Sequence, residues 1–141
     1  MKYLNRIEAF NSFLESKLTT SKRFGVEGTD TVISALNALS EEVANAGMNG
    51  MTLGMAHRGR LSALANVFEK PLERIFAEFQ ENVECNIGEW GNSGDVKYHL
   101  GVCHDVNVNG KEIRLTIVPN PSHLETVNPV AMGCVRAIQD R

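Results

Sequence analysis

Two short segments carry the residues best suited to chemistry, because each places a histidine beside groups that can bind an anion. The first is His57-Arg58-Gly59-Arg60, where an imidazole and two permanent cations surround a glycine that lets a ligand approach the backbone closely. The second is Ser122-His123-Leu124-Glu125. Its serine and glutamate have the spacing of a capping box, which starts a helix with free backbone N–H groups. Helix N-termini attract phosphates and carboxylates, so the two segments predict a site for an anionic ligand.

Taken singly, each histidine also has a structural interpretation, because short motifs often match by chance. Arg58 and Arg60 are open to a surface role, as solvated or salt-bridged cations around a turn histidine. His99 lies in a polar segment that leads into a predicted strand, where a structural role is the simpler interpretation. His104 alternates onto the apolar side of the same strand, which favours a core or edge position. For His123, the structural interpretation is that its side chain covers the start of a helix.

Other site chemistries are disfavoured by the spacing of the candidate residues. The histidines and the three cysteines (Cys85, Cys103 and Cys134) lack the short paired spacings of zinc sites, so we predict no metal ligands among them. The chain contains no Gly-x-Ser-x-Gly elbow, no Walker loop and no Gly-x-Gly-x-x-Gly fingerprint. Three widely spaced cysteines do not form a disulfide framework, and we expect all three to be buried packing residues in a reducing compartment.

Hydrophobic spacing predicts helices and a strand around the first segment. The expected elements of this half are an amphipathic helix from Tyr3 to Leu18, a helix capped by Thr29 or Thr31 and ended by Gly47, a strand over 51–55, a turn at 56–60, a helix from Leu61 to Phe68, a helix opened by Pro71, and a loop over 80–96 anchored by Trp90.

The second half predicts a β-hairpin. Asn109-Gly110 is favoured in two-residue hairpin turns, and strands over 101–108 and 111–118 place Val106 opposite Ile113, with apolar side chains on one face. A last helix is expected with Asn128 as cap and Pro129 as its first residue. The fold class is therefore α/β, with a partial parallel-type sheet, flanking helices and a hairpin. Both anion-binding segments follow strands, where ligands of such sheets bind.

Length and composition restrict the class of protein. The 141 residues suit one domain, and a net charge of −3 disfavours nucleic-acid binding. The longest stretch without formal charge, 43–57, is too short for a membrane-spanning helix and contains two asparagines. No apolar signal segment follows Met1. We therefore predict a soluble protein that binds neither nucleic acid nor membrane.

Four segments, taken in order, resemble the first, decarboxylating component of the 2-oxoglutarate dehydrogenase complex. The resemblance extends from about Arg6 to the end of the chain. The segments are Lys22-Arg23-Phe24-Gly25-Val26-Glu27-Gly28, Gly54-Met55-Ala56-His57-Arg58-Gly59-Arg60-Leu61, Ser93-Gly94-Asp95-Val96-Lys97-Tyr98-His99-Leu100-Gly101 and Asn120-Pro121-Ser122-His123-Leu124-Glu125.

The resemblance implies an enzyme that decarboxylates 2-oxoglutarate with thiamin diphosphate and magnesium, in the tricarboxylic acid cycle. Its expected partners are dihydrolipoyl succinyltransferase, which receives the succinyl unit on a lipoyl group, and dihydrolipoyl dehydrogenase. The parent protein is expected to be a homodimer in the bacterial cytoplasm or the mitochondrial matrix.

The resemblance also implies that the chain is a single fragment of the diphosphate-binding α/β domain, with residues 1–20 as a leading helix and 21–141 as the start of the core. The magnesium ligands and the cofactor-activating glutamate of the family are expected after Arg141, so the fragment alone should be inactive.

Site roles also follow from the resemblance. His57 and His99 match histidines of the family's substrate pocket and are expected to be catalytic. Arg58, Ser122 and Leu124 match residues that contact thiamin diphosphate. Pro119 departs from the family pattern, as does the stretch 81–92. The alternative function is a non-catalytic module in which the same turns hold an anion or a partner chain.

Overall fold

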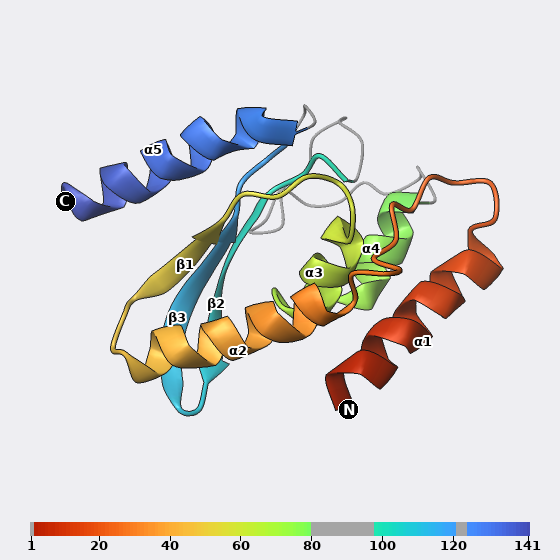
Figure 1. Cartoon of the computed structure of the whole chain (residues 1–141), viewed down its shortest axis with the longest axis horizontal. Helices are drawn as coiled ribbons and strands as arrows, with labels where there is room; N and C mark the ends of the chain where they lie inside the picture. Colours follow the sequence, from red (N-terminus) through yellow and green to blue (C-terminus); the bar gives the residue numbers. More distant parts are fainter. Residues whose placement is uncertain (1, 80–97, 121–123) are drawn as a thin grey trace.

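The computed structural model describes residues 2–79, 98–120 and 124–141, which form a three-stranded sheet flanked by helices (Figure 1). The predicted α/β class is confirmed. In chain order the elements are α1 (Lys2–Lys17), α2 (Thr31–Asn45), β1 (Gly50–Leu53), α3 (Arg60–Asn66), α4 (Leu72–Phe79), β2 (Val102–Val108), β3 (Lys111–Ile117), the 3₁₀ turn η1 (Leu124–Thr126) and α5 (Val127–Gln139).

The sheet has the strand order β1-β3-β2, with β1 parallel and β2 antiparallel to β3. The predicted hairpin register is confirmed, because Val106 pairs with Ile113 and His104 with Leu115 across the β2–β3 ladder. Asn109 and Gly110 both have positive φ, as a tight hairpin turn requires. The parallel pairing of β1 and β3 means that both strands end at the same edge of the sheet.

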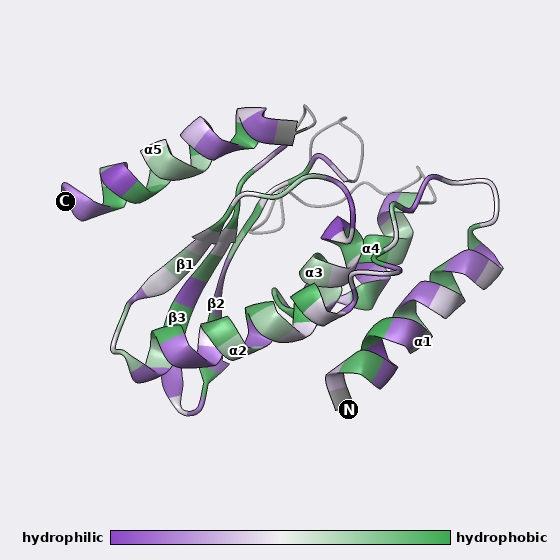
Figure 2. Ribbon diagram, in the orientation of Figure 1, coloured by the Kyte–Doolittle hydropathy of each residue, from purple (hydrophilic) through white to green (hydrophobic). Residues whose placement is uncertain are grey.

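The core lies between the sheet and the helices α1, α2 and α3. The helix α3 is buried on every side. It carries no formal charge after Arg60, as is typical of a helix that is surrounded by protein. The amphipathic helix α1 packs against it through Ile7, Phe10 and Leu14. In Figure 1, β1 lies between α2 and α5, and Figure 2 shows hydrophobic residues on the strands and on the helices α1 to α4.

The predicted helix boundaries are largely confirmed. The helix α2 ends beside Gly47, whose φ of 74° is the left-handed conformation of a glycine C-cap. The predicted cap by Thr29 or Thr31 is wrong, because Asp30 holds the N-cap position and makes no side-chain capping bond. The helix α4 begins directly after Pro71.

The predicted start of the last helix at Asn128-Pro129 is also wrong. The helix α5 begins at Val127 and continues the 3₁₀ turn of Leu124–Thr126, so that Pro129 falls inside its first turn. Proline is tolerated there because the N–H groups of a first helical turn have no intrahelical partner to lose.

The prediction of buried cysteines is wrong for both described cysteines. Cys103 and Cys134 are exposed. Cys103 follows the buried Val102 on β2 and therefore points to the other face of the sheet. Cys134 is an exposed residue of α5, and Cys85 lies outside the described residues.

Of the helices that the structure describes, none is both long enough and apolar enough to span a membrane.

Candidate functional site

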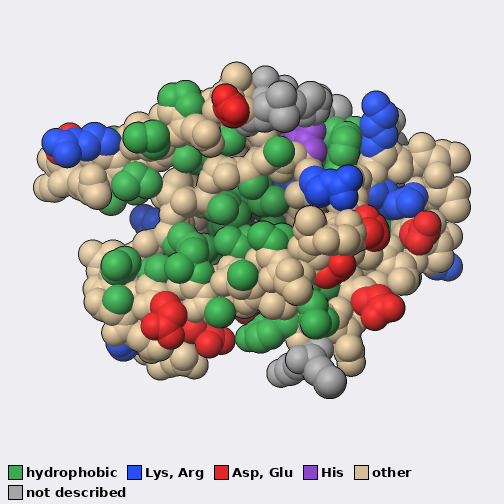
Figure 3. Space-filling view, viewed as in Figure 1, with side chains coloured by type: hydrophobic (Ala, Val, Ile, Leu, Met, Phe, Trp, Pro, Cys, Tyr) green, Lys and Arg blue, Asp and Glu red, His purple; other side chains and the backbone are tan. Residues whose placement is uncertain are grey.

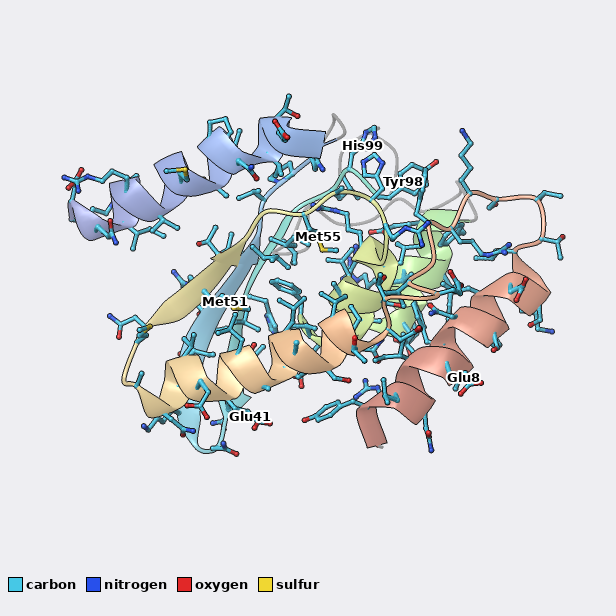
Figure 4. All side chains as sticks on the ribbon, viewed as in Figure 1. Glu8, Glu41, Met51, Met55, Tyr98 and His99 are labelled. Carbon is cyan, nitrogen blue, oxygen red and sulfur yellow. The ribbon has the colours of Figure 1, made fainter. Side chains whose placement is uncertain are left out.

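Three chain segments meet at one edge of the sheet. They are the turn that leaves β1, the segment that enters β2 and the segment that leaves β3. They are brought together because β1 and β3 are parallel while β2 runs in the opposite direction. Figure 4 shows Met55, Tyr98 and His99 at this common end of the sheet.

Four rings form a cluster at this edge, and we call it the ring cluster: Phe24, His57, Tyr98 and His99. The rings of His57 and His99 are stacked, with centroids 4.9 Å apart and planes at 27°. Phe24 lies against both His57, at 5.2 Å, and Tyr98, at 4.9 Å. His57 is buried with only 3% exposure, whereas His99 is half-buried. The structure therefore brings together the two histidines that the resemblance marks as substrate-pocket residues.

Asn120 connects these segments by hydrogen bonds. Its backbone N–H donates to the carbonyl oxygen of His99 at 2.9 Å, and its side-chain amide donates to the carbonyl oxygen of Met55 at 2.8 Å. Its own carbonyl oxygen lies 3.1 Å from Nε2 of His57. Asn120 thus contacts both histidine-bearing segments, although it lies in a third.

Arg60 lies between the three segments at this edge of the sheet, and its role is structural. The side chain is fully buried, and its guanidinium donates to three carbonyl oxygens, those of Met55 at 3.0 Å, Leu100 at 2.8 Å and Val118 at 2.6 Å. Burial lowers the pKa of Arg60 to about 10. Because this pKa is still well above neutral pH, the guanidinium remains cationic. The sequence left two roles open for Arg60, a ligand-binding cation and a surface residue, and both are wrong. Arg60 is instead a buried residue whose hydrogen bonds join the three segments.

Gly59 allows the loop around Phe24 to pack against the turn. Its φ is 74°, and its N–H donates to the carbonyl oxygen of Phe24 at 2.8 Å. A Cβ atom at this position would lie 2.9 Å from a methyl group of Val26. Glycine at position 59 is therefore required both by the backbone conformation and by the close contact, and this contact brings Phe24 to His57.

A second close approach accommodates Pro119, the residue that departs from the family pattern. The strand β3 ends at Ile117, so the missing N–H of Pro119 costs no ladder hydrogen bond. A Cβ atom on Gly101 would lie 2.7 Å from the proline ring. The absence of a side chain at Gly101 therefore makes room for Pro119 beside the ring cluster.

Basic side chains lie on the surface next to the ring cluster. Arg58 is exposed, and one of its guanidinium nitrogens donates to the carbonyl oxygen of Glu27 at 3.2 Å. Lys22 is exposed and Arg23 half-buried in the loop that leads to Phe24. Figure 3 shows histidine side chains with Lys and Arg around them. Arg58 and Lys22 therefore leave positive charge exposed beside the ring cluster, whereas Arg23 lies 3.9 Å from the carboxylate of Glu15.

Several predicted site residues cannot be located in this way. Ser122 and His123 lie outside the described residues, as does the whole predicted loop over 80–96 with Trp90. The backbone of Leu124 begins the 3₁₀ turn η1. Among residues 2–79, 98–120 and 124–141, no group of three or more His, Cys, Asp or Glu side chains could hold a metal ion.

Sequence reasoning missed the roles of Phe24, Arg60 and Asn120. A signal for Arg60 was available, because the uncharged segment that follows it, Leu61 to Phe68, predicts a helix buried all round and so a buried first residue. Nothing in the local pattern indicates that Phe24 and Asn120 lie beside His57, since both come from distant parts of the chain.

Several known proteins with sequences similar to this chain share one enzyme name, 2-oxoglutarate dehydrogenase. The chain is 45% identical over 143 residues to the mitochondrial 2-oxoglutarate dehydrogenase of Dictyostelium discoideum, and 44% identical over 141 residues to the 2-oxoglutarate dehydrogenase E1 component of Bacillus mycoides. Each alignment covers 99% of this chain. The chain is homologous to one segment of the 2-oxoglutarate dehydrogenase E1 component. A 2-oxoglutarate dehydrogenase E1/E2 component of Corynebacterium glutamicum is 44% identical over 142 residues, again 99% of this chain.

The chain spans only a small part of these 2-oxoglutarate dehydrogenase relatives, namely 14% of the Dictyostelium protein, 15% of the Bacillus protein and 12% of the Corynebacterium protein. No protein-family model matches the chain. The homology nevertheless extends across the ring cluster, Arg60 and Asn120, since it covers nearly every residue.

Proposed function

We propose that this chain is the part of a 2-oxoglutarate dehydrogenase E1 component that binds the 2-oxo acid and assists its decarboxylation. The observation that carries the proposal is the stacking of His57 on His99, with ring centroids 4.9 Å apart, in a chain homologous to that component. The two side chains come from separate turns at the sheet edge where ligands of α/β folds commonly bind.

The chemistry of the substrate fits the groups at this edge. 2-Oxoglutarate carries two carboxylates and an oxo group, so its pocket needs cations and hydrogen-bond donors. The exposed cation of Arg58 and the half-buried ring of His99 can supply both. A ring N–H of histidine can stabilise the negative charge that develops on the oxo oxygen, and the ring can exchange a proton near neutral pH.

The described residues fit the diphosphate group of thiamin diphosphate. The exposed guanidinium of Arg58 can pair with a diphosphate oxygen, and we propose the segment of Ser122 and Leu124 for further contacts with the cofactor. When bound, thiamin diphosphate supplies the electron sink for decarboxylation, while the protein supplies orientation and electrostatics. Magnesium requires oxygen ligands, which, following the family resemblance, we propose to lie in other parts of a longer protein.

The proposed reaction also defines the partners. The succinyl unit passes to a lipoyl group of dihydrolipoyl succinyltransferase, and dihydrolipoyl dehydrogenase reoxidises that group. The name of the Corynebacterium relative, a 2-oxoglutarate dehydrogenase E1/E2 component, supports an association of this kind. We propose a homodimeric parent protein, located in the cytoplasm of a bacterium or in the mitochondrial matrix.

A chimeric enzyme tests the function directly. In the Bacillus mycoides E1 component, the 141-residue stretch that aligns with this chain is replaced by the chain itself. The chimera should decarboxylate 2-oxoglutarate in the presence of thiamin diphosphate and magnesium, at a rate within about 10-fold of the Bacillus enzyme, a difference of roughly 1.4 kcal/mol in activation free energy. A correctly folded chimera without 2-oxoglutarate turnover contradicts the proposal.

A non-catalytic anion-binding or assembly module is the alternative, and calorimetry separates the two functions. The isolated chain titrated with thiamin diphosphate and magnesium should show no measurable heat of binding, because the metal ligands are assigned elsewhere. Titration with the diphosphate but without magnesium serves as the control. Binding with a dissociation constant near 1 μM or below, about −8 kcal/mol, would favour the binding module.

A further inference from the structure

We infer that Asn120 is a positioning residue, which holds His57 in the tautomer with its proton on Nε2 and so makes Nδ1 the proton-accepting atom of the ring. The role of that atom in a reaction rests on the proposed function. The tautomer itself does not, because it follows from hydrogen bonds within this chain.

The first step is the contact between His57 and the backbone of Asn120. Nε2 of His57 lies 3.1 Å from the carbonyl oxygen of Asn120, and both residues are buried, with exposures of 3% and 1%. A carbonyl oxygen can only accept a hydrogen bond, so Nε2 must carry the proton. The hydrogen bond at one ring nitrogen selects the tautomer, and a neutral ring then has its lone pair on Nδ1.

The second step is the anchoring of that carbonyl group. The side-chain amide of Asn120 donates to the carbonyl oxygen of Met55, two residues before His57, at 2.8 Å. The backbone N–H of Asn120 donates to the carbonyl oxygen of His99 at 2.9 Å. The carbonyl that selects the tautomer is therefore tied to the turn of His57 on one side and to the segment of His99 on the other.

The third step is the requirement for asparagine at this position. The contact with Met55 needs a donor on a short side chain. Alanine offers no hydrogen-bonding group, and the carboxylate of aspartate would place an acceptor against an acceptor. The ring stacking between His57 and His99 depends on the same arrangement, because both rings belong to segments that Asn120 joins.

The test is nitrogen-15 NMR of the 141-residue chain with labelled histidine rings, recorded at mildly alkaline pH, where an ordinary imidazole is neutral. In the unsubstituted chain, His57 should show a protonated Nε2 and a non-protonated Nδ1. Asn120→Ala should abolish this single pattern and give a mixture of tautomers. A ring protonated on Nδ1 in the unsubstituted chain overturns the inference, whether or not the variant folds.

Asn66→Ala is the matched control. Asn66 is also a buried asparagine whose amide donates to a backbone carbonyl, that of Ser62 at 3.0 Å, but this bond lies within α3. Its loss should lower stability without changing the tautomer of His57. A folded Asn120→Ala chain with the pattern of the unsubstituted chain overturns the positioning role.

The chimeric enzyme provides the second readout. There Asn120→Ala should reduce 2-oxoglutarate turnover roughly 10-fold relative to Asn66→Ala, because a misplaced catalytic group loses its reaction geometry. Equal turnover of the two chimeras overturns the positioning role. An inactive unsubstituted chimera contradicts the proposed function alone, since the tautomer is measured on the separate chain.

Discussion

Replacement of His57 or His99 by alanine in the chimeric enzyme should reduce 2-oxoglutarate turnover about 100-fold or more. A positioned general acid or base contributes roughly 10²- to 10⁴-fold, and the loss of one donor to a developing oxyanion costs about 10²-fold or more. The stacked rings of His57 and His99 act on the same small region, so the two substitutions should not be additive. Steady-state decarboxylation assays measure the effect.

His104→Ala is the matched control for this experiment. His104 is a half-buried histidine on β2, paired with Leu115 of β3 and outside the ring cluster. Its removal should leave turnover within about 3-fold of the unsubstituted chimera, a change of less than 1 kcal/mol in activation free energy. Near-normal turnover in both the His57 and the His99 variants would remove these residues from the reaction.

Replacement of Arg60 by leucine should lower the free energy of unfolding by about 3 kcal/mol. The carbonyl oxygens of Leu100 and Val118 would each lose the donor supplied by Arg60, and a buried group without a partner costs roughly 1–3 kcal/mol. The carbonyl oxygen of Met55 would keep its donor from Asn120. Relief from burying the cation offsets part of the cost. Chemical denaturation of the chain, followed by circular dichroism, measures the change.

Arg58→Leu is the control, because Arg58 is an exposed arginine only two residues away. Its replacement should change stability by no more than about 0.5 kcal/mol. Arg60→Lys should recover only part of the loss, since a single ammonium group cannot match the geometry of the guanidinium with its three carbonyls. Equal stability of the Arg60→Leu and Arg58→Leu chains would contradict the cross-linking role.

Local patterns in the sequence predicted much of the fold. The Asn109-Gly110 turn and the alternation on either side of it gave the hairpin with its register, because a two-residue turn and a period of two leave little freedom in pairing. Gly47 marked the end of α2 for a similar reason. The prediction failed at the start of α5, where a proline is compatible with several positions in the first helical turn and does not select one of them.

The histidines of the candidate site were found from four short segments taken together, and the homology supports their family assignment. Arg60 is buried while Arg58 is exposed, a difference that only the uncharged segment after Arg60 indicates in the sequence, since both are arginines in one turn. That difference arises because α3 enters the interior directly at Arg60.

The residue types, the hairpin, the end of α2 and the family resemblance were determined by the sequence itself, since each depends on neighbours along the chain. Only the tertiary structure decided that Phe24, His57 and His99 share one cluster, that Asn120 joins their segments, and that Arg60 binds three separate carbonyl groups. The physical reason is that these contacts connect residues far apart in sequence. They exist only after β1 and β3 pair in parallel and bring the ends of both strands to one edge of the sheet.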